Sequence, residues 1–248
     1  MKMLKKIIYV LIAVLLSISV YALYNLYKDK TQEKEEIRQN EELSNTVHVY
    51  HNNEITGEIS LPDLNKLKEI NNDLTGWLYI ENAGVDYPVM YTPNDVEKYL
   101  HLSFDESYSF GGLPFIGENC DEDSYVFIIY GHNMLNGTMF GSIDQYSNKS
   151  FYEDNQIIEY TTLSETRKYQ IVYVFNTVID ETSPIAPYFM FVGNLTEESF
   201  DYLIDFCDSN KLYNTGQSIE YGDQVMMLST CYTNNEFGRF VIVAKRVS

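Results

Sequence analysis

The sequence QVMMLSTC at residues 224–231 is an apolar run that ends in a cysteine. The polar stretch YTNNEFG separates it from a second apolar run, RFVIVAKRV, at residues 239–247. Short runs rich in branched and aromatic side chains on either side of a polar turn are typical of paired strands. We expect Cys231 and Arg239 to lie on adjacent strands at one rim of a β-structure.

The pairing of these two residues suggests chemistry at the rim. A guanidinium beside a thiol favours the thiolate and can stabilise an oxyanion. Cys231 is therefore a candidate nucleophile, although a buried structural cysteine fits the same spacing equally well.

Five more short apolar runs precede this pair and are separated by Gly, Asn, Asp or Pro. They occupy residues 76–80, 85–90, 124–130, 156–162 and 168–178. Seven runs of this kind predict a closed or nearly closed barrel, in a chain that is mainly β with flanking helices (α+β).

Two amphipathic helices are predicted beside these strands. Residues 60–72 carry Ser60 as a cap and Pro62 in the first turn, with an apolar face formed by Leu61, Leu64, Leu67 and Ile70. Residues 196–210 carry Thr196 as a cap and acidic residues in the first turn.

The N-terminal segment predicts a membrane anchor. Residues 7–27 contain no charged side chain, and as a helix they span about 31 Å, the thickness of a hydrocarbon core. Lys2, Lys5 and Lys6 precede them, which favours a cytoplasmic N-terminus and a catalytic domain outside. A cleaved signal peptide is the competing interpretation. The polar residues 31–45 follow as a solvated helix or stalk.

The composition excludes several classes of protein. The chain has 248 residues and a formal net charge of −19, so a nucleic-acid partner is not expected. Three cysteines are too few for a disulfide scaffold. No His and Cys cluster has the spacing of metal ligands, and we expect no metal or cofactor. The acidic residues 121–123 are better explained as a solvated loop than as a weak calcium site.

His132 is the histidine best placed for catalysis. It follows the apolar strand YVFIIY through Gly131, with Asn133 beside it, which is where a general acid or base is held rigidly within reach of substrate. A loop histidine without a role fits this position equally well. A packing role is expected for His101, which lies within YLHLSF, and for Cys207, whereas Cys120 lies in a polar loop.

Three motifs resemble the hallmarks of the sortases, Gram-positive cysteine transpeptidases. They are LSTC at residues 228–231, YGHNM at 130–134 and GRFVIVAK at 238–245. The sequence GTMFGSI at 137–143 and the predicted helices resemble class B. In the sortase pattern TLxTC, the first Thr is replaced here by Met227, a position that we assign to packing.

The resemblance implies a closed barrel of about eight strands, N-terminal helices and a long helix between the sixth and seventh strands. It divides the chain into a cytoplasmic N-terminus (1–6), a transmembrane signal-anchor (7–27), a stalk and N-terminal helical region (28–58) and a catalytic barrel domain (59–248).

The resemblance also implies a reaction. Cys231 would attack the carbonyl after Thr in a C-terminal sorting motif of a surface protein, giving a thioester that an amine of a peptidoglycan precursor resolves. His132 would act as general acid and base, and Arg239 would hold the substrate carbonyl or the oxyanion.

Ser229, Thr230 and Asn133 are candidate substrate-binding residues, and residues 184–193 would cover the groove that selects the motif. Glu236 is a loop candidate for orienting His132.

Two rival functions use the same fold. One is a hydrolytic cysteine peptidase, which releases the acyl group to water. The other is a membrane-anchored, wall-associated module without activity, in which Cys231 is structural.

Overall fold

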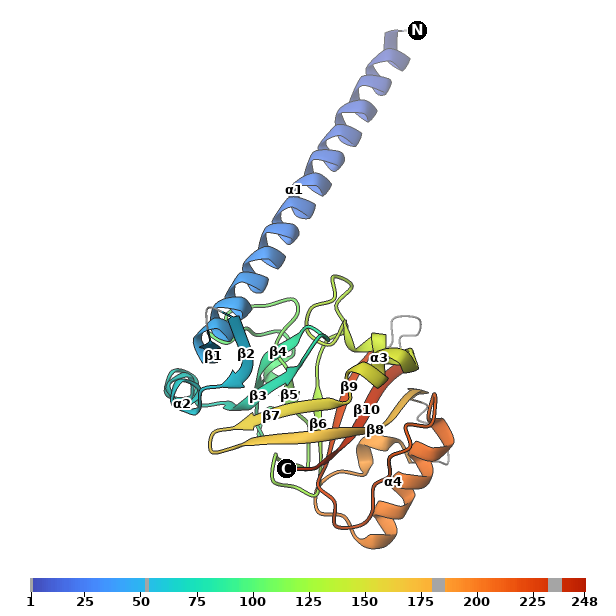
Figure 1. Cartoon of the computed structure of the whole chain (residues 1–248). Coiled ribbons are helices and arrows are strands. Elements are labelled where there is room, and N and C mark those ends of the chain that lie inside the picture. Colours follow the sequence, from blue (N-terminus) through green and yellow to red (C-terminus); the bar gives the residue numbers. More distant parts are fainter. Residues whose placement is uncertain (1, 52–53, 180–185, 232–237) are drawn as a thin grey trace. The chain divides into compact units, whose positions relative to one another are not determined.

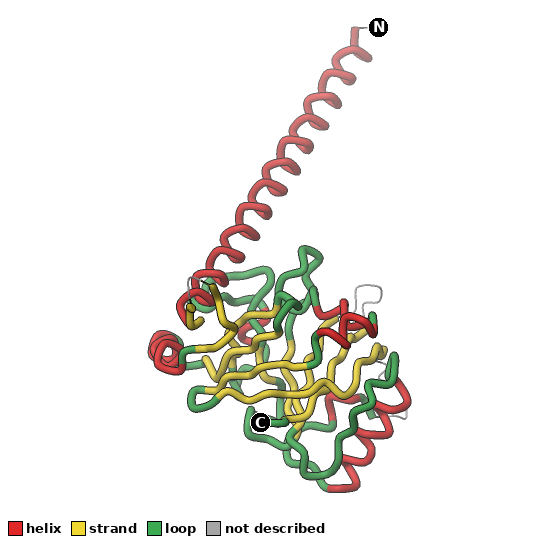
Figure 2. The backbone as a smooth tube through the Cα atoms, viewed as in Figure 1, coloured by secondary structure: helices red, strands yellow, loops and turns green. Residues whose placement is uncertain are grey.

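The computed structural model describes residues 2–51, 54–179, 186–231 and 238–248 (Figure 1). The chain divides into two compact units, residues 1–41 and 42–248. The first unit is helical, and the second contains a closed barrel with helices outside the strands (Figure 2).

One continuous helix, α1 (Lys2–Val47), contains both the apolar segment 7–27 and the polar segment 31–45. Its apolar part is long enough, by length and composition, to cross a membrane. The hydroxyls of Ser17 and Ser19 each donate to the carbonyl four residues earlier, at 2.9 Å. These bonds satisfy polar groups that would otherwise be costly to place in hydrocarbon.

The predicted barrel is confirmed, and it is closed. Its strands run in the order β10-β8-β7-β3-β4-β5-β6-β9, with β9 paired to β10. The bounds are β3 (Leu74–Ile80), β4 (Val85–Met90), β5 (Phe115–Ile116), β6 (Val126–Tyr130), β7 (Ile157–Thr162), β8 (Thr166–Val178), β9 (Val225–Cys231) and β10 (Gly238–Arg246). The sequence did not reveal β5, because two residues are too short to show an alternating pattern.

Two pairings in the barrel are parallel and the rest are antiparallel. Strand β4 pairs with β5 through Met90 and Phe115, and β6 pairs with β9 along five consecutive positions that end at Tyr130 and Ser229. Because parallel neighbours end at the same edge of a sheet, β6 and β9 deliver their carboxyl ends to one rim of the barrel.

The helices lie where the sequence predicts them. Helix α2 (Leu61–Ile70) follows a small two-stranded sheet of β1 (His48–His51) and β2 (Glu54–Ile59). Helix α4 (Glu197–Asn210) lies between the sixth and seventh barrel strands in chain order. The sheet and a short helix, α3 (Lys149–Asp154), were not predicted. The described residues also contain three 3₁₀ turns: η1 (Lys98–Leu100), η2 (Ile143–Ser147) and η3 (Tyr188–Met190).

The predicted start of α4 agrees with the structure, whereas α2 differs from its prediction in two details. The Thr196 cap on α4 is confirmed, since its hydroxyl accepts from the Ser199 amide at 3.3 Å. Ser60 occupies the N-cap position of α2 as predicted, but its hydroxyl donates to the Asp63 carboxylate at 2.6 Å instead of accepting a backbone amide. Ile70 was expected on the buried face of α2 but is 74% exposed at the last turn.

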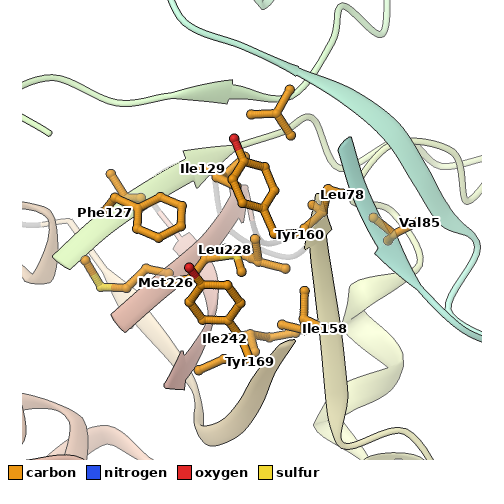
Figure 3. Packing of buried hydrophobic residues seen from close by; sticks show 14 of the residues in the cluster. Leu78, Val85, Phe127, Ile129, Ile158, Tyr160, Tyr169, Met226, Leu228 and Ile242 are labelled. Atoms are coloured by element: carbon orange, nitrogen blue, oxygen red, sulfur yellow. The ribbon is translucent and has the colours of Figure 1, made fainter. Parts of the chain in front are cut away.

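Large side chains fill the barrel (Figure 3). Tyr160 and Tyr169 extend inward from β7 and β8 toward Phe127, Met226 and Ile242, and all five are fully buried. Burial of each such side chain stabilises the fold by about 1.5–3 kcal/mol. Met227 is also fully buried, which confirms its packing assignment.

The Asp86 carboxylate on β4 joins the end of α1 to the barrel. It accepts hydrogen bonds from the Ser44 hydroxyl at 2.5 Å, from the Trp77 indole at 2.7 Å and from His48 Nε2 at 2.9 Å. Burial raises the pKa of the Asp86 carboxyl, but the bonds from His48, Ser44 and Trp77 outweigh burial and hold the pKa below its ordinary value.

The substitution Asp86→Asn should destabilise the barrel at neutral pH. We expect the free energy of unfolding to fall by about 2–4 kcal/mol, because buried donors lose a charged acceptor. Since the folded-state pKa is depressed, the stabilisation is complete above about pH 4 and disappears as the pH falls through the folded value. Denaturation of the full chain in detergent micelles, followed by fluorescence of Trp77, the single tryptophan, measures this.

Asp63→Asn on α2 is the matched control, because that carboxylate pairs with Lys66 at the surface. It should leave the unfolding transition nearly unchanged. Equal effects of the two substitutions would show that Asp86 is not a link between α1 and the barrel.

Candidate active site

The pairing register brings the three predicted catalytic positions to one rim of the barrel. Cys231 is the last residue of β9 and lies directly opposite Arg239 on β10. On the other side of β9, Tyr130 pairs with Ser229, and the Gly131 amide donates to the Ser229 carbonyl at 3.2 Å. His132 follows at once, so positions 132, 231 and 239 belong to three neighbouring strand ends.

The Cys231 backbone is described only as part of β9, and its side chain lies outside the described structure. The loop at residues 232–237 is likewise outside it, which includes the candidate orienting residue Glu236.

A backbone carbonyl orients His132. Its Nε2 atom lies 2.9 Å from the carbonyl oxygen of Leu100, at the end of η1. Because a carbonyl can only accept, Nε2 carries the hydrogen, and Nδ1 is the nitrogen left to exchange a proton. No sequence pattern indicates this contact, since any residue at position 100 supplies the same carbonyl.

Burial is the main influence on the His132 imidazole and lowers its pKa. The bond to the Leu100 carbonyl acts in the opposite direction, and the charge of His101 adds to the lowering. The neutral imidazole is thus favoured in the free protein, which suits a group that must accept a proton.

The position of His101 is the principal correction to the predicted site. A packing role was expected, but its side chain is exposed and its ring stacks against His132, with 5.2 Å between ring centroids and 24° between planes. The apolar neighbours in YLHLSF suggested burial. The turn at η1 instead directs residue 101 to the rim.

Arg239 is half-buried at the start of β10, where its Nη1 atom donates to the Gly238 carbonyl at 2.9 Å. Burial raises the pKa of the Tyr130 hydroxyl on β6, and the Arg239 charge opposes that rise. The Arg239 charge therefore acts on the end of β6, the strand that leads into His132.

The three predicted substrate-binding residues have partners within the protein or lie buried. The Ser229 hydroxyl is fully buried and lies 2.6 Å from the Tyr188 hydroxyl in η3. Thr230 is 3% exposed, and the Asn133 amide donates to Asp144 at 3.1 Å. Substrate binding by these residues stays a prediction.

The described part of the segment predicted to cover the site, residues 186–193, is attached to the barrel. Besides the contact of Tyr188 with Ser229, Gly193 and Val126 exchange two backbone hydrogen bonds at 2.7 and 3.1 Å. This segment therefore lies over the same strands that carry the site.

The other two cysteines are unsuited to catalysis. Cys207 is fully buried on α4, as predicted. Cys120 is also buried, and burial raises the pKa of its thiol to about 11. Among the residues that the structure describes, no group of three His, Cys, Asp or Glu side chains could hold a metal ion.

Comparison with known proteins places this arrangement in a family. Residues 78–247 match the sortase domain family. Sortase B of Staphylococcus aureus is 24% identical over 99% of this chain and 97% of its own length, and sortase B of Listeria monocytogenes is 27% identical over 78% and 77%. The solved Staphylococcus aureus sortase B–substrate complex shares the fold, with a TM-score of 0.72, 22% identity and coverage of 88% and 99% of the two chains.

The chain belongs to the sortase family, whose members are cysteine transpeptidases. Within that family it is a class B sortase, in agreement with its relatives and with the helix between the sixth and seventh barrel strands.

Gly112 holds the carbonyl that orients His132. It has a φ of +56°, and a Cβ there would overlap the carbonyl oxygens of Leu100 and Tyr99. We expect Gly112→Ala to displace the Leu100 carbonyl and to lower kcat/KM by about 10- to 100-fold, because small displacements of catalytic groups are costly. Peptide cleavage assays and ¹⁵N NMR of the His132 ring nitrogens measure the two effects.

Gly216→Ala is the matched control. Gly216 has a φ of +78°, but a Cβ there would meet no atom within 4 Å. It should lose about 1–2 kcal/mol of stability from backbone strain alone and keep its kcat/KM. If the control loses as much activity as Gly112→Ala, strain rather than the Leu100 carbonyl explains the effect.

Proposed function

We propose that this class B sortase joins surface proteins to the cell wall through a thioester at Cys231. The Cys231 sulfur attacks the carbonyl carbon that follows Thr in a C-terminal sorting motif, and the C–N bond breaks as the C–S bond forms. His132 takes the thiol proton of Cys231 on Nδ1 as the sulfur attacks, and gives that proton to the leaving amine. It then takes a proton from an incoming amine of a peptidoglycan precursor, which displaces the thiolate and forms the new amide.

One observation carries the assignment of the residues. The parallel register of β6 with β9 and the antiparallel register of β9 with β10 bring positions 132, 231 and 239 together at one rim. A thiol nucleophile, a proton carrier and a fixed cation are the three groups that amide exchange through a thioester requires.

The roles of His132 and Arg239 follow from their surroundings. With Nε2 held by the Leu100 carbonyl, Nδ1 is the atom of His132 that exchanges protons with the thiol and the two amines. Arg239 stabilises the oxyanion of each tetrahedral intermediate or holds the substrate carbonyl, because a guanidinium presents several N–H donors and a positive charge to an oxygen that gains negative charge.

We place the enzyme at the cell membrane. The apolar part of α1 would be a single uncleaved span, with residues 1–6 in the cytoplasm and the barrel domain outside. The basic residues before the apolar segment support this orientation. The acidic body would then face the wall, where the sorting-motif proteins and the precursor amine are found.

A peptide panel tests the reaction. The full chain in detergent micelles is given fluorogenic peptides with NPQTN-like, PPxTG-like and LPxTG-like motifs, with and without an added amine. We expect one motif to be cleaved after Thr and the product to be captured by the amine. Cys231→Ala should lower the rate by more than about a thousand-fold, since no other group can form the thioester.

Cys120→Ala is the matched control, because it removes a buried thiol of raised pKa. It should keep full activity. Release of the free acid alone, at every amine concentration, would favour a hydrolytic peptidase. Cleavage that survives in Cys231→Ala, or that never occurs in the wild type, would contradict the proposal.

A further inference from the structure

Three aromatic rings form a row that leads from His132 to the surface. The ring centroids of His132 and His101 are 5.2 Å apart, and those of His101 and Tyr108 are 6.2 Å apart. The planes of each pair lie within 28° of parallel. Tyr108 is 62% exposed, so the row ends in solvent.

The two outer rings come from one hairpin, which its own bonds hold in shape. Leu102 and Tyr108 form an isolated β-bridge, and the Ser109 amide donates to the His101 carbonyl at 3.0 Å. At the tip, the Asp105 carboxylate accepts from the Ser103 hydroxyl at 2.6 Å. None of these bonds uses the His101 ring, so a change of that side chain should leave the hairpin intact.

Two consecutive residues, Leu100 and His101, contact the His132 ring. Leu100 binds Nε2 through its carbonyl, and the next residue, His101, covers a face of the ring. A displacement of the His101 ring would therefore also disturb the hydrogen bond from His132 Nε2 to the Leu100 carbonyl. A Cβ at Gly112 would overlap the Leu100 carbonyl oxygen, so the observed position of this carbonyl requires a glycine there.

Charge couples the two imidazoles. Two positive rings about 5 Å apart repel each other, so a proton on one opposes a proton on the other. In the described structure, the charge that lowers the pKa of His132 comes from His101. The other titratable or charged groups on η1, on the hairpin, at the end of β6 and at the start of β10 are Lys98, Tyr99, Asp105, Glu106, Tyr108, Tyr130 and Arg239.

We propose that His101 is a positioning residue of the transpeptidase, which holds the His132 ring by stacking and sets its proton affinity by charge. This role rests on the function proposed above. His132 must release a proton to the leaving amine and then recover one from the incoming amine. A neighbouring imidazole makes it a readier donor in the first half-reaction and a weaker base in the second.

Two substitutions separate stacking from charge. His101→Phe keeps an aromatic ring between His132 and Tyr108 but cannot be protonated. His101→Ala removes both the ring and the charge. We expect the pKa of His132 to rise by about 0.5–1 unit in both, because a cation at this distance in a half-exposed site is lost. We expect kcat to fall in His101→Ala and to be largely kept in His101→Phe.

The first readout is independent of activity. Side-chain ¹⁵N NMR titration of the full chain in detergent micelles follows four histidines, and loss of one signal in His132→Gln identifies His132. An unchanged signal from His48, which is buried beside Asp86, would show that the fold is intact. A His132 titration that His101→Phe does not move would overturn the proposal.

The second readout is the pH profile of kcat/KM with the cleaved peptide. Its acid limb reports the pKa of the free enzyme's imidazole, so it should move to higher pH in His101→Phe by the same amount as the NMR titration. A shift seen by NMR with an unmoved acid limb would also overturn the role of His101 in the reaction.

The two proposals fail differently. If Cys231→Ala does not affect cleavage, the proposed function fails, whereas the NMR coupling of His101 with His132 is measured without any reaction.

Tyr108→Ala tests the outer ring of the row and should lower kcat, because the His101 ring loses its stacking partner. The matched control is Tyr202→Ala, an exposed tyrosine on α4, which should leave kcat unchanged. Equal kcat values for these two variants would count against the row of rings as a support for His132.

Discussion

The parallel pairing of β6 with β9 is the interaction on which the rest of this structure depends. Together with the other neighbouring pairs it completes the closed ring of strands. It also joins segments that are nearly a hundred residues apart, and so carries a large cost in chain entropy that the buried core must offset. The core side chains of β6 and β9, including Phe127, Met226 and Leu228, are fully buried, and their burial contributes to that offset. The rim that carries positions 132, 231 and 239 is a direct consequence of these pairings.

Around that rim, neutral partners hold His132 and Ser229 in place. A peptide carbonyl holds His132, and a tyrosine hydroxyl holds Ser229. A carboxylate beside His132 would stabilise the imidazolium strongly. A carbonyl fixes the tautomer with a weaker effect on charge, and burial and His101 can then keep the ring neutral. The His132 imidazole is therefore held in one orientation while its neutral form stays favoured.

The elements that the sequence predicted are those whose pattern is local. The apolar runs of β7, β8 and β10 alternate or are continuously buried, and α4 has both a cap and an amphipathic face, so each could be recognised from its own residues. Strand β5 was not predicted, because its two residues form a strand only through pairing with β4 and β6. His101 was assigned to packing for a similar reason, since apolar neighbours in sequence do not reveal which way a 3₁₀ turn will direct a side chain.

The sequence by itself determined the class of fold, the presence of an apolar segment of membrane-spanning length and the identity of Cys231, His132 and Arg239 as candidates. These depend on composition, periodicity and motifs, which are properties of short stretches. Only the tertiary structure decided that the orienting group for His132 is the Leu100 carbonyl, and that a second histidine stacks on its ring. Both contacts join residues about thirty positions apart in the chain. One is made by a backbone carbonyl and the other by an exposed ring, so neither produces a pattern of residue types along the sequence.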